Sequence, residues 1–298
     1  MTPSPMTPMP RTTTTETTPA TEAAHPSART LPLRTELRRQ LGRGRTKALF
    51  ALVIALPVIF VAAFAIGSSG EPNAAAASFI DLATLSSSNF TVFTLIVTAD
   101  LLLSIIAAMF LGDPIPTEAN WHSLRYLLTA PVSRLRLLTS KLIVGAGLTF
   151  VAIVALVGWA LLLGALVYGV DPYRGLTGVT LTWTDMWPRL IGVAVFLFIG
   201  VLQVGALAFL LGVRSETPLA PVGGAVLIVI VSAILNNLSA LGSLRHALPL
   251  HYSIAWLNLL NHQITWTDLT RGVVWSLLYP VVFLGLGVRR FLRGDVLS

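Results

Sequence analysis

Six long apolar runs limit what this chain can fold into more than any other feature of its sequence. Each run holds about twenty mostly apolar residues, which is the length that a helix needs to cross the hydrocarbon core of a bilayer. The runs are continuously apolar and do not alternate, so they favour helices over the strands of a membrane barrel. The predicted spans are residues 48–67, 89–111, 142–168, 190–212, 219–241 and 270–288.

Composition supports this prediction. The chain has 298 residues, of which 54% are hydrophobic and 11% are charged. A soluble protein of this size cannot bury so many apolar side chains in one core. The sequence therefore predicts an all-α polytopic membrane protein with six transmembrane helices. There is no cysteine, which excludes disulfides and thiolate chemistry.

Basic residues are distributed unevenly between the predicted connections. Of the 20 lysines and arginines, all but four lie before the first span, after the last span, or in the connections that follow the second and fourth spans. The four exceptions are Arg174, Arg189, Arg245 and Arg271. Since basic connections stay on the cytoplasmic side, we expect both termini to be cytoplasmic. The net charge of +7 then reflects topology and contact with anionic membrane lipids, and no nucleic-acid partner is expected.

The sequence before the first span divides into two parts. Residues 1–28 are mostly Thr, Pro, Ala and Ser, a composition that predicts a disordered cytoplasmic tail. In residues 29–47, Leu33, Leu37 and Leu41 recur every four residues with arginines between them. This pattern predicts an amphipathic helix that lies in the membrane interface, although a simple basic anchor for the first span remains an alternative. Residues 48–298 then form the six-span domain.

Four polar residues interrupt the predicted spans and are candidates for a translocation path or a subunit interface. They are Asp100, Gln203, Asn236 and Asn237. An ionised Asp100 near the middle of the second span is costly unless it is hydrated, paired or protonated. It either faces a path or an interface, or it is a protonated residue that bonds to a neighbouring helix. The two asparagines either line a polar cavity or tie helices together.

The segment 113–141 is a long polar stretch between the second and third spans, on the side expected to be cytoplasmic. Glu118 falls in the first turn of a predicted helix, where the helix dipole favours a negative charge. Trp121, Leu124 and Leu128 follow at helical spacing and share one face. The sequence therefore predicts a short amphipathic helix that projects from the membrane between two spans.

This segment resembles the loop between the second and third spans of bacterial ABC-2 type transporter permeases. That loop is often written E-x-x-W-G-T-L-R-x-L-L, followed by V-S-R and K-L. The matching residues are Glu118, Trp121, Ser123-Leu124-Arg125, Leu127-Leu128, Pro131-Val132-Ser133-Arg134 and Lys141. His122-Ser123 stands where the family has Gly-Thr. The resemblance extends to the basic helix, the six-span layout and the closing RRFLRGD, and it covers roughly residues 30–298.

The resemblance implies that the predicted helix is a coupling helix, which docks into a groove on a separate ABC ATPase subunit. The residues that it assigns to ATPase coupling are Glu118, Trp121, His122, Leu124, Arg125, Leu128 and Arg134. A small amphipathic helix with an aromatic anchor is a usual way to enter a partner's groove. An interfacial helix that contacts lipid alone remains the alternative reading of these residues.

The chain carries no phosphate-binding loop for nucleotide. Its two lysines, Lys47 and Lys141, do not follow the sequence G-x-x-x-x-G-K-[ST]. We therefore expect no enzymatic site, cofactor or metal in this chain, and expect ATP and Mg²⁺ to be bound by the partner ATPase. His246, His251 and His262 lack the spacing of metal ligands.

These observations predict the permease subunit of an ATP-driven exporter in the bacterial plasma membrane, paired with a second permease subunit. The spans carry few charges, which favours an apolar or amphipathic cargo such as a drug, an antibiotic or a lipid. Alternating access would move this cargo outward. The alternatives are an intramembrane enzyme, for which the motifs G-x-S-x-G and H-E-x-x-H are absent, and a membrane sensor or scaffold without transport activity.

Overall fold

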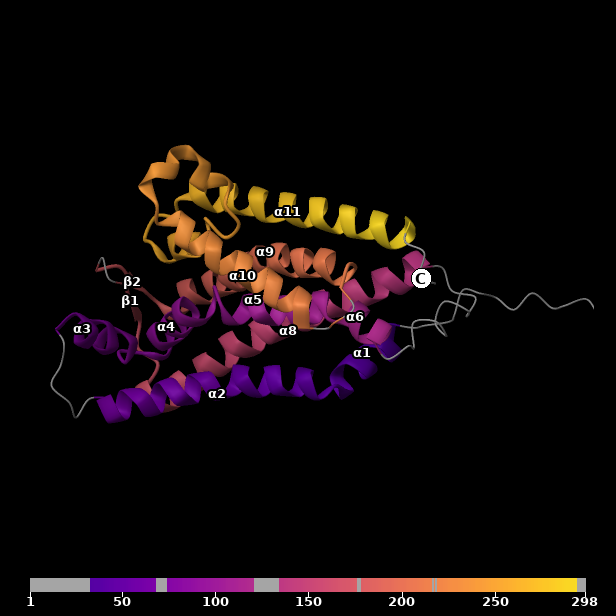
Figure 1. The fold of residues 1–298 in the computed structure, drawn as a ribbon. Coiled ribbons are helices and arrows are strands. Elements are labelled where there is room, and N and C mark those ends of the chain that lie inside the picture. Colours follow the sequence, from indigo (N-terminus) through magenta and orange to yellow (C-terminus); the bar gives the residue numbers. More distant parts are fainter. Residues whose placement is uncertain are drawn as a thin grey trace, which may run out of the picture.

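The computed structural model describes residues 33–67, 74–120, 134–175, 178–215, 217 and 219–293. Within them the chain is almost entirely helical, as predicted (Figure 1). One short antiparallel hairpin joins β1 (Tyr173–Arg174) to β2 (Thr180–Leu181). The all-α polytopic membrane fold is therefore confirmed.

Five helices are long and apolar enough to cross a membrane. They are α2 (Gly44–Gly67), α8 (Arg134–Tyr168), α9 (Trp183–Gly212), α10 (Leu219–Asn236) and α11 (Trp266–Arg293). A sixth span is made of two helices, α4 (Ser87–Thr98) and α5 (Leu102–Gly112), which together pass the same test. Most of these helices begin before the predicted apolar runs, because a helix continues into the polar interface beyond the hydrocarbon core.

The second span is not the continuous helix that its apolar run predicted. The axes of α4 and α5 meet at a bend of 60°, and Asp100 lies in the turn between them. Hydropathy misses such a break because the residues on both sides are apolar. Irregular backbone at membrane depth is tolerated where it is buried in protein or lines a cavity, and a small cavity adjoins Asp100.

The bundle has two different ends (Figure 1). The amphipathic helix α1 (Leu33–Gly42), the short helix α6 (Pro114–Asn120), the start of α8 and the end of α11 gather at one end, here named the basic end. At the opposite end lie α3 (Ala74–Ala83), the hairpin, and a segment that contains the 3₁₀ helices η1 (Ser239–Ala247) and η2 (Ala255–Leu260). Residues 239–265 are called the capping segment below.

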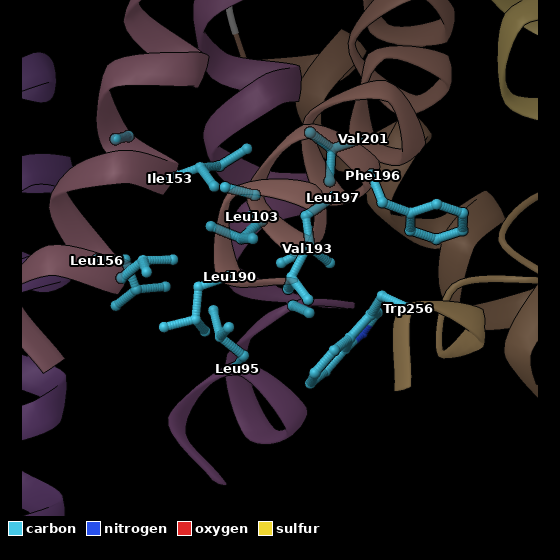
Figure 2. Close-up of a cluster of buried hydrophobic side chains, with 14 of the residues drawn as sticks. Leu95, Leu103, Ile153, Leu156, Leu190, Val193, Phe196, Leu197, Val201 and Trp256 are labelled. Atoms are coloured by element: carbon cyan, nitrogen blue, oxygen red, sulfur yellow. The ribbon is translucent and has the colours of Figure 1, made fainter. Parts of the chain in front are cut away.

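Helix α9 forms the centre of the bundle, and it is the most buried of the five unbroken spans. It packs against α11, α5 and α10. Figure 2 shows its apolar face meeting side chains from α4, α5, α8 and η2. The labelled residues are Leu95, Leu103, Ile153, Leu156, Leu190, Val193, Phe196, Leu197, Val201 and Trp256. This core fixes the position of the capping segment, because Trp256 of η2 is fully buried in it.

Apolar side chains also cover much of the outer surface of the bundle. In the apolar stretch of α2 only 17% of the residues are buried. Exposed examples elsewhere are Leu166 of α8 and Val281 of α11. In water such a surface would aggregate, whereas in a bilayer it contacts lipid tails.

Gly145 of α8 lies where two spans approach closely. A Cβ atom at this position would lie 2.5 Å from the backbone carbonyl oxygen of Phe110 in α5. Gly147, two residues further along α8, has no such neighbour within 4 Å. Small residues let helix backbones come together in lipid, and Gly145 does so here.

We expect Gly145→Ala to lower the free energy of unfolding by about 1–3 kcal/mol, because the backbone of Phe110 must move away from the new methyl group. Gly147→Ala is the matched control and should be neutral or stabilising by up to about 1 kcal/mol, since alanine favours the helix. Thermal unfolding in detergent micelles measures both variants. Equal effects of the two substitutions would contradict the close packing of α5 and α8.

Candidate functional site

Most of the residues assigned to ATPase coupling lie outside the described residues. The range 121–133, which is not among the described residues, contains Trp121, His122, Leu124, Arg125 and Leu128. The side chains of Glu118 and Arg134 also lie outside the described part of the structure. Their role stays a prediction. The structure instead describes both ends of the segment 113–141 and the helices that hold them.

The C-terminal end of the segment 113–141 is held by an ion pair between α8 and α1. The Lys141 ammonium of α8 lies 3.4 Å from Oε1 of Glu36, and both side chains are almost fully buried, with exposures of 3% and 2%. Glu36 also accepts hydrogen bonds from Gln40 at 3.1 Å and from Arg39 at 2.7 Å. Its carboxylate is therefore well compensated, as a buried charge must be.

The N-terminal end of the segment 113–141 is held in a similar way, by basic residues at the start of α2. Asp113 follows α5, and its Oδ1 accepts from Nη1 of Arg45 at 2.6 Å and from the Thr117 hydroxyl at 2.9 Å. Nη1 of Arg43 lies 3.8 Å from the other carboxylate oxygen. The Asp113 side chain is nearly buried, whereas that of Arg45 is nearly half exposed.

Two ion pairs therefore tie both ends of the segment 113–141 to the N-terminal helices. We name Glu36, Arg45, Asp113 and Lys141 the N-terminal clasp. Helix α1 turns the row of Leu33, Leu37 and Leu41 outward and its Glu36 face toward α8. The exposed leucines fit the predicted interfacial helix, while its buried acidic face adds a contact that a simple basic anchor would not need.

Sequence reasoning missed the clasp, although one signal pointed to it. Glu36 is an acidic residue in a strongly basic helix, and Gln40 lies four residues further on the same face. That pattern marks a polar face that differs from the arginine-rich one. Which residues it meets is a long-range property that the local pattern does not contain.

Glu36 makes the attachment of α1 sensitive to acid. Burial raises the pKa of its carboxyl, but Lys141, the Gln40 hydrogen bond and Arg39 outweigh this effect and hold the pKa below its usual value. A carboxyl with a lowered folded pKa stabilises the fold above its unfolded pKa, and that contribution is lost as the pH falls through the folded pKa.

We therefore expect the stability difference between wild type and Glu36→Gln to narrow as the pH falls from about 7 to below about 4. At neutral pH the ionised carboxylate stabilises the wild type, and after protonation it resembles the amide of the variant. Unfolding temperatures at a series of pH values test this expectation. A difference that stays constant or widens in acid would contradict the assignment of the charged pair.

A second polar site lies near the break between α4 and α5. A cavity of about 20 Å³ is lined there by Asp100, by Gln203 of α9, by Ser276 of α11, and by the turn His251–Ser253 of the capping segment. Ser253 lines this cavity together with Asp100. Gln203 donates from Nε2 to the Gly200 carbonyl at 2.8 Å and to the Ser276 hydroxyl at 3.3 Å.

Two of the four candidate path residues thus line one cavity, and a third is linked to it. Oδ1 of Asn236 lies 2.5 Å from Nδ1 of His251, and His251 lines the cavity. Asn237, which directly follows α10, is exposed and donates from Nδ2 to the Ala233 carbonyl of that helix. The structure therefore joins Asp100, Gln203 and Asn236 and leaves Asn237 apart. Sequence reasoning missed His251 and Ser253, because nothing local shows that the capping segment reaches Asp100.

The surroundings of His251 favour its neutral imidazole. Burial lowers the pKa of His251, and the neighbouring His246 and Arg245 lower it further, against a smaller opposing effect of Asp268. Nε2 of His251 lies 3.1 Å from Nδ1 of His246, and the Tyr252 hydroxyl is 3.1 Å from the same His246 atom. These contacts and the one with Asn236 fix the orientation of the His251 ring, which lines the cavity.

Comparison with known proteins supports the family that the segment 113–141 resembles. The profile of a family described as ABC-2 family transporter protein matches residues 44–232, which is more than half of the chain. Comparisons with curated proteins and with solved structures yielded no match. The matched range runs from the first residue of α2 into α10 and includes the segment 113–141. The chain therefore belongs to the ABC-2 family of transporter proteins and is a multi-pass transmembrane subunit of a transporter.

Proposed function

We propose that this chain is the permease subunit of an ATP-driven exporter and that a separate ABC ATPase docks on its segment 113–141. The observation that carries the proposal is the placement of this segment. It lies within the family match, and its described ends, residues 113–120 and the start of α8, lie at the basic end, where the clasp fastens them to the N-terminal helices.

The basic end is cytoplasmic in this proposal, because basic connections remain on the side where ATP is available. The sequence has no phosphate-binding loop of its own, so a partner must hydrolyse ATP. Closure of the ATPase would push on the segment, and the clasp would pass that movement to α5, α8 and α1 together. Two permease subunits, identical or related, would form the path.

The cargo of this proposed exporter is apolar or amphipathic. The surface of the spans is largely apolar, and Asp100 is the charged residue at the level of the cavity. A drug, a peptide antibiotic or a lipid fits such surroundings better than a small hydrophilic ion does. The cell is expected to be bacterial, with the protein in its plasma membrane.

Co-purification with an ABC ATPase tests the proposal. We expect Glu118→Arg and Trp121→Ala to lower both the amount of bound ATPase and its turnover by about tenfold or more, because a central aromatic anchor carries much of the binding energy in such grooves. Trp266→Ala, at an exposed position at the opposite end, is the matched control and should change neither quantity. ATPase association and transport that survive both changes in the segment would overturn the proposal.

The rival functions predict different results. A membrane sensor or scaffold keeps its function when the catalytic site of the ATPase is inactivated, whereas an exporter loses transport. An intramembrane enzyme shows turnover in the isolated chain, whereas a permease needs its ATPase.

A further inference from the structure

The break between α4 and α5 places a carboxylate beside a polar cavity within a membrane span. Asp100 lies in the turn between the two helices, whose axes differ by 60°. Transporters commonly form binding sites where a membrane helix is discontinuous, because the interrupted backbone and nearby polar groups can face a ligand there. Here the break, the carboxylate and the cavity coincide.

Asp100 is the acidic group of this site, and no lysine or arginine is among the described residues that line the cavity. The ion pairs described above join basic side chains to Glu36 and Asp113, and within the described residues no lysine or arginine pairs with Asp100. The end of α4 and the start of α5 carry opposite partial charges, which largely cancel. The sign of any net charge at this site therefore depends on Asp100. The nearby Ser253, which also lines the cavity, is uncharged.

The remaining groups around the cavity suit a small hydrogen-bond donor with a positive charge. Gln203 uses its amide N–H groups on Gly200 and Ser276, so its carbonyl oxygen remains an acceptor. The rings of Phe196, Tyr252 and Trp275 also line the cavity, and aromatic faces attract cations. A volume of about 20 Å³ admits one group of the size of a water molecule.

We propose that Asp100, with Gln203 and the surrounding aromatic rings, binds the protonated amine group of an amphipathic cargo. A primary ammonium has the size of the cavity, donates three hydrogen bonds and neutralises the carboxylate. A wholly apolar cargo would leave the charge of Asp100 uncompensated, and a divalent ion takes six or more oxygen ligands, usually several of them charged. The role of this site in export rests on the proposed function, whereas the binding of an amine at Asp100 does not depend on that function.

Direct binding to the purified chain, without an ATPase, tests the inference. The probe is radiolabelled octylamine, with octanol as the uncharged competitor of the same length and NaCl as the inorganic competitor. We expect saturable binding of octylamine that octanol does not displace. Asp100→Asn should weaken this binding by about tenfold or more, because a charge-assisted contact becomes a neutral one. Gln203→Met, which removes the acceptor, should weaken it by a smaller factor.

Asp171→Asn removes an exposed carboxylate from the connection before the hairpin and should leave binding unchanged. Equal octylamine binding by wild type and Asp100→Asn would overturn the inference, as would displacement by octanol. Displacement by NaCl at concentrations at which KCl has no effect would assign the site to sodium instead and would also overturn it. Because no ATPase is present, failure here leaves the proposed coupling to an ATPase intact, and loss of coupling leaves this binding intact.

Discussion

Replacing Lys141 by methionine is expected to lower the free energy of unfolding by about 3–5 kcal/mol. The substitution leaves Glu36 buried, with its strongest compensating charge removed. Removing one partner of a buried ion pair is costly because the other charge stays out of water without full compensation. The loss should be largest in the attachment of α1, so amide hydrogen exchange of residues 33–42 should increase together with the fall in unfolding temperature.

The double variant distinguishes the pair from a general defect. In Glu36→Leu with Lys141→Met both charges are gone, and stability should return to near that of the wild type, since an apolar pair of similar volume often replaces a buried ion pair without loss. Arg38→Met, at an exposed position of the same helix, is the matched control and should have an effect below about 0.5 kcal/mol. A double variant that is as unstable as Lys141→Met would contradict the assignment of the pair.

Asp113→Asn is expected to reduce the ATPase turnover that the permease supports by about 5- to 150-fold, the range of typical coupling energies. The amide keeps the shape of the side chain and its hydrogen bond with Thr117, but it loses the charge that holds Arg45 and Arg43. The start of α6 would then move independently of α2. Because the residues of the predicted coupling helix are unchanged, the amount of bound ATPase should fall much less than its turnover.

A double-mutant cycle tests this assignment. Arg45→Met should reproduce much of the effect, and combining it with Asp113→Asn should add little, because both changes break the same contact. Asp81→Asn, at an exposed position in α3 at the opposite end, is the control. Additive effects of Arg45→Met and Asp113→Asn would show that the ion pair is not the coupling element, and an unchanged turnover in Asp113→Asn would show the same.

Local patterns in the sequence were sufficient to predict the spans. A run of about twenty apolar residues can satisfy its backbone in lipid only as a helix, so α2, α8, α9, α10 and α11 lie where the apolar runs predicted them. The exception is the span interrupted at Asp100. A hydropathy average over the run is hardly changed by a single carboxylate, and a local average does not show that residues of the capping segment line a cavity with Asp100.

Contacts between distant residues account for what the sequence did not predict. Glu36 and Lys141 are separated by 105 residues, and Arg45 and Asp113 by 68. Neither pair has a spacing that a helical or extended pattern would reveal. Likewise Asp100, Gln203 and Asn236 were recognised as polar residues in apolar runs, but their connection through His251 and Ser253 requires the capping segment to fold back onto α9 and α11.

Cross-linking from the segment 113–141 tests whether an ABC ATPase docks there. Because the chain has no cysteine, Ser123→Cys introduces a single reactive site in the predicted coupling helix and leaves the predicted anchor Trp121 in place, and Asp171→Cys introduces one at the opposite end. With a short thiol-to-amine cross-linker applied in native membranes, we expect an adduct of the Ser123→Cys chain with an ABC ATPase and no such adduct from Asp171→Cys. An adduct from Asp171→Cys and none from Ser123→Cys, or no ATPase adduct from either position, would contradict the proposed docking.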